Sequence, residues 1–477
     1  MTGLNVFRDF VQFGVMLVLV RLLAPEAYGQ FGLVMAIMGF LSILSFRVFL
    51  EHTLQIRPGG EVDYQLHFTA GAVIQAVLFL LTNLAAEVLK RFPTYAPVAP
   101  LVHVMSLVFV LELGHEFRVK MLEREMDWKR LRILQGIGVV ANAVLSLIMA
   151  KAGAGVYALL VPSLLPSVPA VVDLFFIQRW RPTWKWDAAR FVPARDYGLT
   201  RLMSAVVGWT RPLVESSFLV KIAGYALYGI YGRALGLATI CCLKVPTLLG
   251  QALFPVLTKL DPGSGSSNRA STLVLCSVAW STFPIAVIFS VLASTVVHTL
   301  YGARWSAAIP FLPWAMAAGA ATALAQTGNI LLIANLRQKR SLCIDGITLA
   351  GTVAGLVVLA PRSLNLYLIG IAAVQTAAFL LILVWLCRLR TLDLPGIARS
   401  LILPGVSAAA SFAGLELLRN LLGSFSRETV GGAILYGLVF SMIYVLLLRL
   451  TARQQCREVV SLLPGRSRLE RWLVLGT

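Results

Sequence analysis

Charged side chains lie inside two neighbouring apolar runs of the sequence, where lipid could not solvate them. Arg201, Arg211 and Glu215 share the first run. At about 100° per residue, Glu215 returns to within about 40° of Arg201, and Arg211 lies one helical turn before Glu215, in pairing range. Arg233 and Lys244 occupy the next run, and on a helix they lie within about 20° of each other. Each run therefore predicts a helix with a cationic stripe.

A cationic stripe on a membrane helix has two interpretations. It lines a water-filled cavity that accepts an anionic substrate, or it belongs to an ion-pair network between helices. The guanidinium fork of arginine matches phosphate oxygens, which favours the cavity. Arg8 and Arg47 lie near the ends of apolar runs, where long side chains can reach the interface. Arg47 is retained as a further candidate for the cavity.

Three carboxylates inside apolar runs, Glu215, Glu112 and Asp173, are candidates for ion coupling. A carboxylate beside cations in a cavity can load and release a proton or a cation. A lone buried carboxylate is as often a hydrogen-bond partner in helix packing. Both interpretations stay open for each residue.

A repeated glycine–aromatic element lies at the start of two of the helices that must position these residues. Its first copy, residues 28–32, follows an apolar run that ends in a cation and a turn; its second copy, residues 228–232, follows a run that ends at Lys221. Glycine allows a helix start to pack closely against a neighbour or to bend. The matching surroundings predict two structural halves with a common plan, as in many transporters. The residues expected to act as hinges or packing points are Arg21, Pro25, Gly29, Gly32, Gly229 and Gly232.

The composition places these runs in a polytopic, all-α membrane protein. Of 477 residues, 58% are hydrophobic and 13% charged, whereas a soluble domain carries about a quarter charged residues. The six cysteines show neither zinc spacing nor a disulfide framework, so we expect no metal site and no cofactor. The net charge of +19 indicates positive-inside bias and attraction to anionic lipid rather than binding to nucleic acid.

The apolar runs predict about 14 transmembrane helices with both termini in the cytoplasm. With a cytoplasmic N-terminus, 26 Lys and Arg residues fall in inside segments and nine in outside ones. Arg118 is counted in the inside loop between the fourth and fifth spans. The second span is expected over 29–50, the sixth over 154–177, and the seventh and eighth over 199–221 and 225–256. The predicted layout is a six-helix lobe (1–178), a basic cytoplasmic linker (179–197), a second six-helix lobe (198–390), two additional helices (391–450) and a basic cytoplasmic tail (451–477).

The linker mixes tryptophans with cations. Trp180, Trp184 and Trp186 stand among five Lys and Arg residues. Such a mix is typical of a segment lying in the inner leaflet interface. We interpret it as a membrane anchor, with a partner-docking or gating link between the halves as the alternative.

Four motifs in this order resemble a known family. They are the run 21–32 after the first span, Leu227–Leu237, Leu253–Leu257 and Tyr301–Pro310. Together they resemble bacterial polysaccharide transporters, the O-antigen and exopolysaccharide repeat-unit flippases of the multidrug/oligosaccharidyl-lipid/polysaccharide exporter superfamily.

The resemblance implies two six-helix lobes around a central cavity, with two extra C-terminal helices. It implies a non-enzymatic flippase that moves a polyprenyl-pyrophosphate-linked oligosaccharide, a polysaccharide repeat unit, from the inner to the outer leaflet of the bacterial inner membrane by alternating access. The implied partners are this lipid-linked oligosaccharide, membrane lipids, a driving H⁺ or Na⁺, and other polysaccharide-assembly proteins.

Three alternatives remain. A drug or metabolite exporter of the same superfamily would favour an acidic, aromatic cavity, and the surplus of arginine over carboxylates on the seventh and eighth spans argues against it. A polymerase or ligase would need an extracytoplasmic catalytic loop, and the outside breaks contain no His/Asp/Glu cluster. A scaffold would act through its basic loops and tolerate charge reversal at Arg211.

Overall fold

The computed structural model describes residues 2–54, 63–244, 247–248, 265–389, 394–422 and 428–451, and within these ranges every regular element is a helix. The all-α prediction is therefore confirmed for this part of the chain. The chain divides into two compact units, Met1–Ile230 and Tyr231–Thr477, which are described separately. The division falls within one long helix, whereas the predicted lobes part at the linker 179–197.

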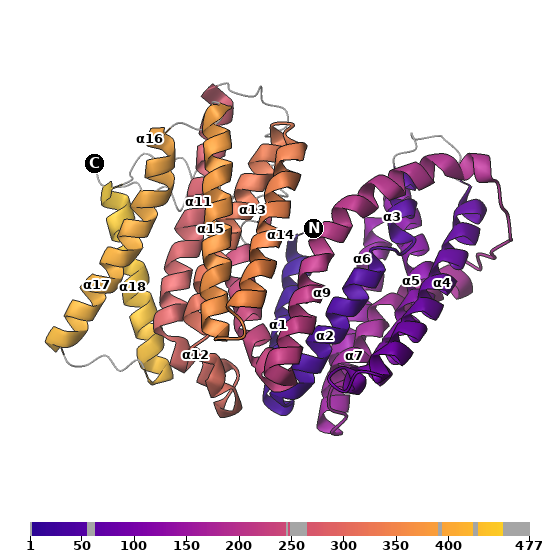
Figure 1. The fold of residues 1–477 in the computed structure, drawn as a ribbon, viewed down its shortest axis with the longest axis horizontal. Coiled ribbons are helices and arrows are strands. Elements are labelled where there is room, and N and C mark those ends of the chain that lie inside the picture. Colours follow the sequence, from indigo (N-terminus) through magenta and orange to yellow (C-terminus); the bar gives the residue numbers. More distant parts are fainter. Residues whose placement is uncertain are drawn as a thin grey trace. The chain divides into compact units, whose positions relative to one another are not determined.

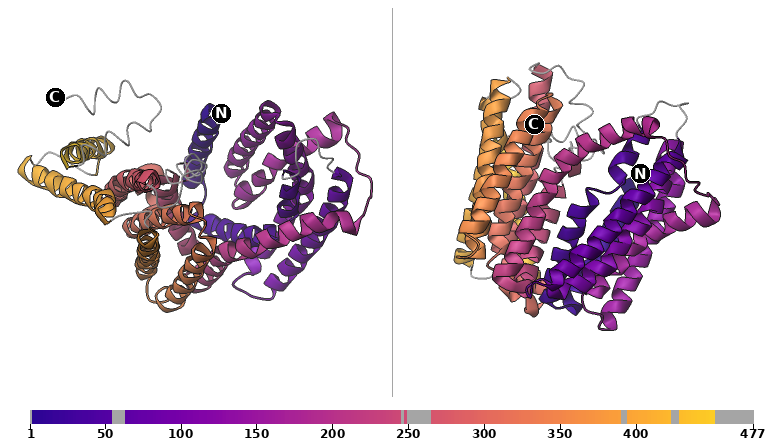
Figure 2. Two further views of the ribbon diagram at one scale, coloured as in Figure 1. Left: turned by 90° about the horizontal axis from the view of Figure 1, so that it is seen from above. Right: turned by 45° about the vertical axis from the view of Figure 1, so that its right-hand side comes forward.

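The first unit is a bundle of long helices joined by short turns (Figures 1 and 2). Its elements are α1 (Thr2–Leu22), α2 (Pro25–Ser42), α3 (Arg47–Leu50), η1 (Glu51–Leu54), α4 (Tyr64–Lys90), η2 (Ala96–Val98), α5 (Ala99–Glu125), α6 (Trp128–Lys151), α7 (Tyr157–Leu160), η3 (Pro162–Ser167), α8 (Val168–Val172), η4 (Asp173–Ile177) and the first part of α9 (Ala188–Ala238).

Local sequence signals explain where several of these helices begin. Pro25 occupies the first turn of α2, where its missing N–H and fixed φ cost nothing, and Glu26 follows it. Asp63 caps α4 by accepting a hydrogen bond from the Leu66 N–H at 3.2 Å. Asp127 caps α6 in the same way, accepting from the Arg130 N–H at 3.0 Å.

The two copies of the glycine–aromatic element pack against each other, α2 against α9. A Cβ added at Gly29 would overlap the carbonyl oxygen of Tyr225, and one added at Gly229 would overlap the carbonyl oxygen of Pro25. A Cβ at Gly32 would lie 3.0 Å from the ring of Tyr228. The glycines therefore let two helix backbones touch, which no other residue permits at positions 29 and 229.

The long α9 holds the predicted seventh span and the first part of the predicted eighth span. Gly224 has φ 76° and ψ 169°, a conformation outside the helical region that glycine adopts readily. The chain changes direction there, at the turn expected between the two spans. The hydroxyls of Ser216 and Tyr228, one from each side of the bend, lie 2.7 Å apart and fix it.

The second unit is built mainly on long apolar helices. It contains the end of α9, η5 (Thr239–Leu243), α11 (Gly265–Val291), α12 (Ala293–Leu300), η6 (Ala303–Ala308), α13 (Leu312–Ala334), α14 (Gln338–Val358), α15 (Leu364–Arg388), α16 (Leu394–Ile397), η7 (Ala398–Ile402), α17 (Leu403–Leu422) and α18 (Val430–Thr451).

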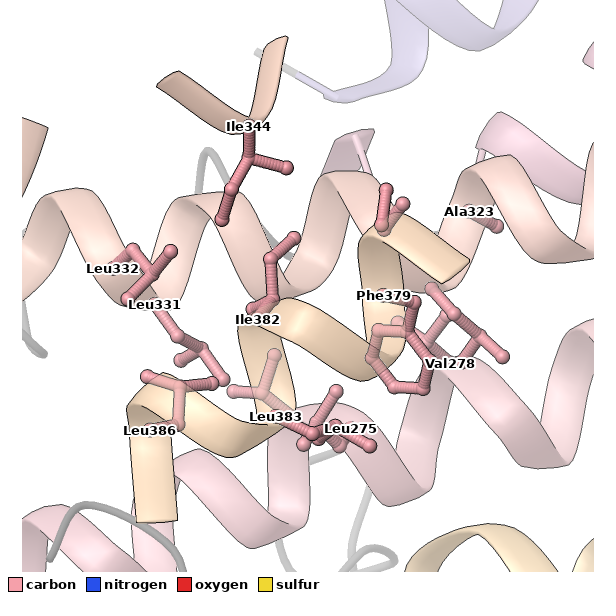
Figure 3. Close-up of a cluster of buried hydrophobic side chains, with 14 of the residues drawn as sticks. Leu275, Val278, Ala323, Leu331, Leu332, Ile344, Phe379, Ile382, Leu383 and Leu386 are labelled. Atoms are coloured by element: carbon pink, nitrogen blue, oxygen red, sulfur yellow. The ribbon is translucent and has the colours of Figure 1, made fainter. Parts of the chain in front are cut away.

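The core of this unit lies where α11, α13 and α15 meet. Leu275, Leu331, Ile382 and Leu386 are fully buried there and interdigitate (Figure 3). Gly328 on α13 is part of the same contact, because a Cβ there would lie 2.6 Å from the Ile382 side chain. The core is therefore set by close helix contact, the mode expected where lipid supplies no hydrophobic drive between helices.

Eleven helical stretches among the described residues are long and apolar enough to cross a membrane. The three remaining predicted spans correspond to α1, whose apolar part is Val11–Leu22, to α2, and to the second half of α9, which is joined to the first half in one stretch, Gly208–Leu243. The second span is shorter than predicted, because α2 ends at Ser42 and a turn precedes α3. The motif at 253–257 and the tail from 452 lie outside the described residues.

The close approach of α2 and α9 yields a stability prediction. Gly29→Ala places a methyl group against a backbone carbonyl, and overpacking of this kind costs roughly 1–3 kcal/mol. We expect a lower unfolding temperature for this variant in detergent. Gly232→Ala is the matched control from the second copy, because its Cβ would meet no atom within 4 Å. Equal unfolding temperatures for the two variants would contradict the contact.

Candidate functional site

Arg211 and Glu215 form the predicted pair on the first half of α9. The Arg211 Nε lies 3.8 Å from Glu215 Oε2, and the side chains are 29% and 14% exposed. Pro212 stands inside the helix between them, and its carbonyl accepts a hydrogen bond from Ser216 Oγ at 2.6 Å. The prediction of an i,i+4 pair is confirmed. The pair lies roughly two and a half to three and a half turns before the bend at Gly224 in the same helix.

Of the other predicted stripe residues, only Arg233 and Lys244 have described side chains. Arg201 lies on α9, but its side chain is outside the description. Arg233 is half-buried and Lys244 is exposed, both in the second unit. Between them the helix widens into η5, a π-helical turn. The predicted shared face assumed a uniform α-helix, so that calculation was wrong, because a π-helical turn shifts the phase.

Arg47 starts α3 and pairs with a carboxylate on α5. Its Nε lies 3.7 Å from Glu116 Oε1; the Arg47 side chain is 59% exposed and that of Glu116 is 11% exposed. Arg47 is therefore an accessible cation whose charge is partly compensated from one side. Glu116 was not singled out from the sequence.

Glu112 lies one turn before Glu116 and meets a polar side chain of α4. Gln75 Nε2 donates to Glu112 Oε2 at 3.3 Å. Gln75 is buried, and its Oε1 has no hydrogen-bond partner among the described residues. An unsatisfied acceptor next to a carboxylate is costly in an apolar setting, and a proton or cation shared by the two groups would relieve that cost.

Asp173 is enclosed by two arginines. It accepts from Arg118 Nε and, through its other oxygen, from Arg130 Nη2 at 2.7 Å. The Gln178 amide, with its oxygen turned inward, accepts from Arg130 at 2.8 Å. Arg118 was predicted to lie in a cytoplasmic loop, which is wrong, since α5 continues to Glu125 and buries it. This arrangement favours the packing interpretation of Asp173.

The predicted linker begins with a segment, residues 178–187, that is bound to α4. Gln65 binds it with both ends of its amide, donating to the Arg181 carbonyl at 3.1 Å and accepting from the Thr183 N–H at 2.7 Å. The Lys185 Nζ lies 2.6 Å from Asp63. We call residues 178–187 the strap, and from Ala188 onward the linker is already α9.

The tryptophans of the strap divide into two groups. Trp180 packs into an aromatic cluster with Phe68 and Phe117 in the first unit. Trp184 and Trp186 are exposed beside the cations, with Trp184 78% exposed. The exposed pair has the character of a membrane-interface anchor, whereas Trp180 fastens the strap to the protein.

Sequence reasoning also missed Asp345, a carboxylate within the apolar helix α14. Its Oδ1 accepts from Asn329 Nδ2 of α13 at 2.9 Å, and Ser341 Oγ donates to Asn329 Oδ1 at 3.2 Å. Among the described residues no cation pairs with Asp345. The same search for carboxylates in apolar runs could have found it, because it lies within the expected eleventh span, 342–360.

The fold is that of known membrane transporters. The structure of the lipid II flippase MurJ in an inward closed conformation matches with a TM-score of 0.71 at 12% identity, over 94% of this chain and 98% of that one. An inward-facing multidrug resistance MATE family transporter of the MOP superfamily matches with a TM-score of 0.59 at 14% identity, over 80% of this chain and 94% of that one. These likenesses define the class: a multi-pass membrane protein with the MurJ/MATE transporter fold.

The family follows from the sequence. Residues 18–310 match the family model described as polysaccharide biosynthesis protein, and the chain belongs to that family. The lipopolysaccharide biosynthesis protein WzxC of Escherichia coli (strain K12) is 22% identical over 71% of this chain and 71% of its own length. The succinoglycan biosynthesis transport protein ExoT of Rhizobium meliloti (strain 1021) is 22% identical over 62% of this chain and 60% of its own. The resemblance read from the motifs is confirmed.

The strap yields a prediction about pH. The hydrogen bond and charge of Lys185 hold the pKa of Asp63 below its usual range. Because the pKa of Asp63 is lower in the folded state, its ion pair stabilises the strap fully at pH values above the usual aspartate pKa of about 4. This stabilisation is lost as the pH falls through the lower pKa of the folded state. The Thr183 amide donates to Gln65 and the Lys185 amide donates to Thr69 Oγ1 at 3.0 Å, both in α4. We expect these two amides to lose hydrogen-exchange protection over that acidic range.

The Asp63→Asn variant should show weak protection of these amides already at neutral pH, with little further change on acidification. Asp196→Asn, an exposed carboxylate outside the strap paired with Arg195 at 2.9 Å, is the control and should behave as wild type. A strap that stays protected in the Asp63→Asn variant would show that this ion pair does not hold it.

Proposed function

We propose that this protein is a flippase that moves a polyprenyl-pyrophosphate-linked oligosaccharide, a polysaccharide repeat unit, from the inner to the outer leaflet of the bacterial inner membrane. The observation that carries the proposal is the combination of a polysaccharide biosynthesis family with a flippase fold over nearly the whole chain. ExoT, a relative over 62% of the chain, is named a transport protein. A protein that transports a product of polysaccharide assembly would account for both the family match and the transporter fold.

The proposed binding groups for the pyrophosphate are cations within apolar helices. Arg211 is the leading candidate, because Glu215 faces its Nε and is its only ion-pair partner among the described residues. Its terminal nitrogens stay available for a fork to phosphate oxygens. The proposal extends to four further cations: Arg201, Arg233, Lys244 and Arg47. They would act in a central cavity that opens alternately to each leaflet, with both termini in the cytoplasm.

Ion coupling is proposed to fall on carboxylates that are not already neutralised by arginine. Glu112 beside Gln75 and Asp345 beside Asn329 are such sites, each between two helices. Glu215 would change its pairing with Arg211 as substrate arrives and leaves. Asp173 is the weakest candidate, since two guanidinium groups enclose it. Removing its charge would leave the buried Arg118 and the half-buried Arg130 without their carboxylate partner.

A second candidate function is export of drugs or metabolites, which the likeness to a multidrug MATE transporter favours. That class would bind cations in an acidic cavity. The arginines on α9 argue for an anionic substrate instead, and the family match covers 18–310 with a polysaccharide family.

The function is tested by mass spectrometry of lipid extracts from cells with and without the gene, with polymer initiation intact. We expect deletion to leave completed polyprenyl-linked oligosaccharide on the inner leaflet and to abolish the surface polymer. Single repeat units stranded on the outer leaflet would instead indicate an enzyme acting after flipping. Unchanged polyprenyl lipids would contradict the proposal and direct the search to efflux of drugs and metabolites.

The role of Arg211 is tested by charge reversal at normal membrane levels of the protein. Arg211→Glu should stop translocation, and Arg211→Lys should retain part of it, since lysine keeps the charge and loses the bidentate fork. We expect at least a tenfold loss for the Glu variant, the size of one charge-assisted hydrogen bond of about 1.5–3 kcal/mol. Arg195→Glu, on an exposed turn of the same helix, should be tolerated.

Two further results separate the alternatives. The charge swap Arg211→Glu with Glu215→Arg keeps an ion pair, so recovery of translocation would mean that the pair is only structural; the cavity model predicts that translocation stays low. Loss of function in Arg195→Glu with full activity in Arg211→Glu would support a scaffold that acts through its basic loops.

A further inference from the structure

One face of α6 carries a groove that the proposed transport function does not use. The groove has a volume of about 900 Å³, with Trp128, Lys129 and Arg132 at one end and apolar side chains from Ile133 to Val144 beyond them. It is open at its centre, because Gly136 lines it and a Cβ there would meet no atom within 4 Å.

The opposite face of α6 is closed by protein. A Cβ added at Gly138 would lie 2.7 Å from the Cα of Pro166 in η3. The two glycines of this helix therefore have different roles: Gly138 allows a helix contact, and Gly136 leaves a hollow on the open side. A hollow maintained by glycine on the open side of a membrane helix makes room for a lipid chain.

The positive charge of Lys129, at the end of the groove, is not compensated by a nearby carboxylate among the described residues. This side chain is exposed. Arg132 is half-buried, and its Nη1 donates to the Gln135 side chain at 3.2 Å. No acidic residue is among the described residues that line the groove. The end of the groove is thus suited to an anionic group, and Trp128 marks the level of the membrane interface.

The length of the apolar part fits a lipid of a single leaflet. From Ile133 to Val144 a helix rises about 16 Å, and one leaflet contributes about 15 Å of the hydrocarbon core. A chain lying along this stripe would reach the bilayer midplane while its head group stayed beside Lys129.

We propose that this groove binds an anionic phospholipid of the membrane, with its phosphate between Lys129 and Arg132 and one acyl chain along Ile133–Val144. The site is separate from the cations of α9 that are proposed to bind the transported substrate. It would fasten α6 to the surrounding leaflet and give the protein a dependence on anionic lipid.

The proposal is tested by titrating phosphatidylglycerol or phosphatidylcholine into the detergent-solubilised full chain and counting bound lipids by native mass spectrometry. Lys129→Gln and Arg132→Gln should each weaken phosphatidylglycerol binding about five-fold, the equivalent of about 1 kcal/mol per cation near a membrane surface. Phosphatidylcholine binding should change little. Lys151→Gln, an exposed cation at the other end of α6, is the matched control and should bind as wild type.

A second variant tests the chain-binding part without touching the charges. Gly136→Leu fills the hollow and contacts no protein atom within 4 Å of its Cβ, so the fold should persist, while phosphatidylglycerol binding should fall. Unchanged binding in Lys129→Gln, Arg132→Gln and Gly136→Leu would overturn the proposal. Preferential displacement of phosphatidylglycerol by polyprenyl pyrophosphate at this groove would also overturn it, by assigning the groove to the transported lipid.

Discussion

The first unit depends on one backbone contact, where α2 and α9 cross at Gly29 and Gly229. Nearly two hundred residues of sequence separate these glycines, yet each leaves room for a carbonyl oxygen of the other helix. In a membrane, helices gain little from burying apolar surface against each other, so close backbone contact and polar bonds hold them. The bend at Gly224 and the Ser216–Tyr228 hydrogen bond then fix the direction of α9 beyond this crossing. The charged pair on α9 is positioned by the same contact, because the helix that carries it is fixed there.

Charged side chains are buried in this protein where a group of opposite charge pairs with them. Asp173 binds two arginines, and one of them, Arg118, is buried within α5. Breaking such a pair leaves an uncompensated buried charge, a loss of roughly 3–5 kcal/mol. Glu112 and Asp345 differ, since amide side chains are their partners. This contrast separates charges that hold helices together from charges with the freedom to change state during transport.

Local relations in the sequence were predictable, and distant ones were not. The Arg211–Glu215 pair follows from a spacing of four residues, and the break at Gly224 follows from the residue type. The bond from Arg118 to Asp173 joins residues 55 apart, so hydropathy assigned Arg118 to a loop, although its partner allows it to stay in the helix. The prediction that Arg233 and Lys244 share one helix face was wrong for a different reason. A π-helical turn lies between them, and it has no clear sequence signal. The two copies of the glycine element were recognised in the sequence, but only the structure showed that they contact each other.

The most direct test of the central claim is leaflet transfer by the purified full chain in liposomes. A fluorescent polyprenyl-pyrophosphate-linked oligosaccharide is placed in one leaflet, and its appearance in the other is followed by a membrane-impermeant quencher, with an imposed H⁺ or Na⁺ gradient and without ATP. We predict transfer that requires the protein and is faster than transfer of a polyprenyl lipid lacking the pyrophosphate. Equal rates in protein-free liposomes, or transfer indifferent to the pyrophosphate, would contradict a flippase that recognises its substrate through arginine.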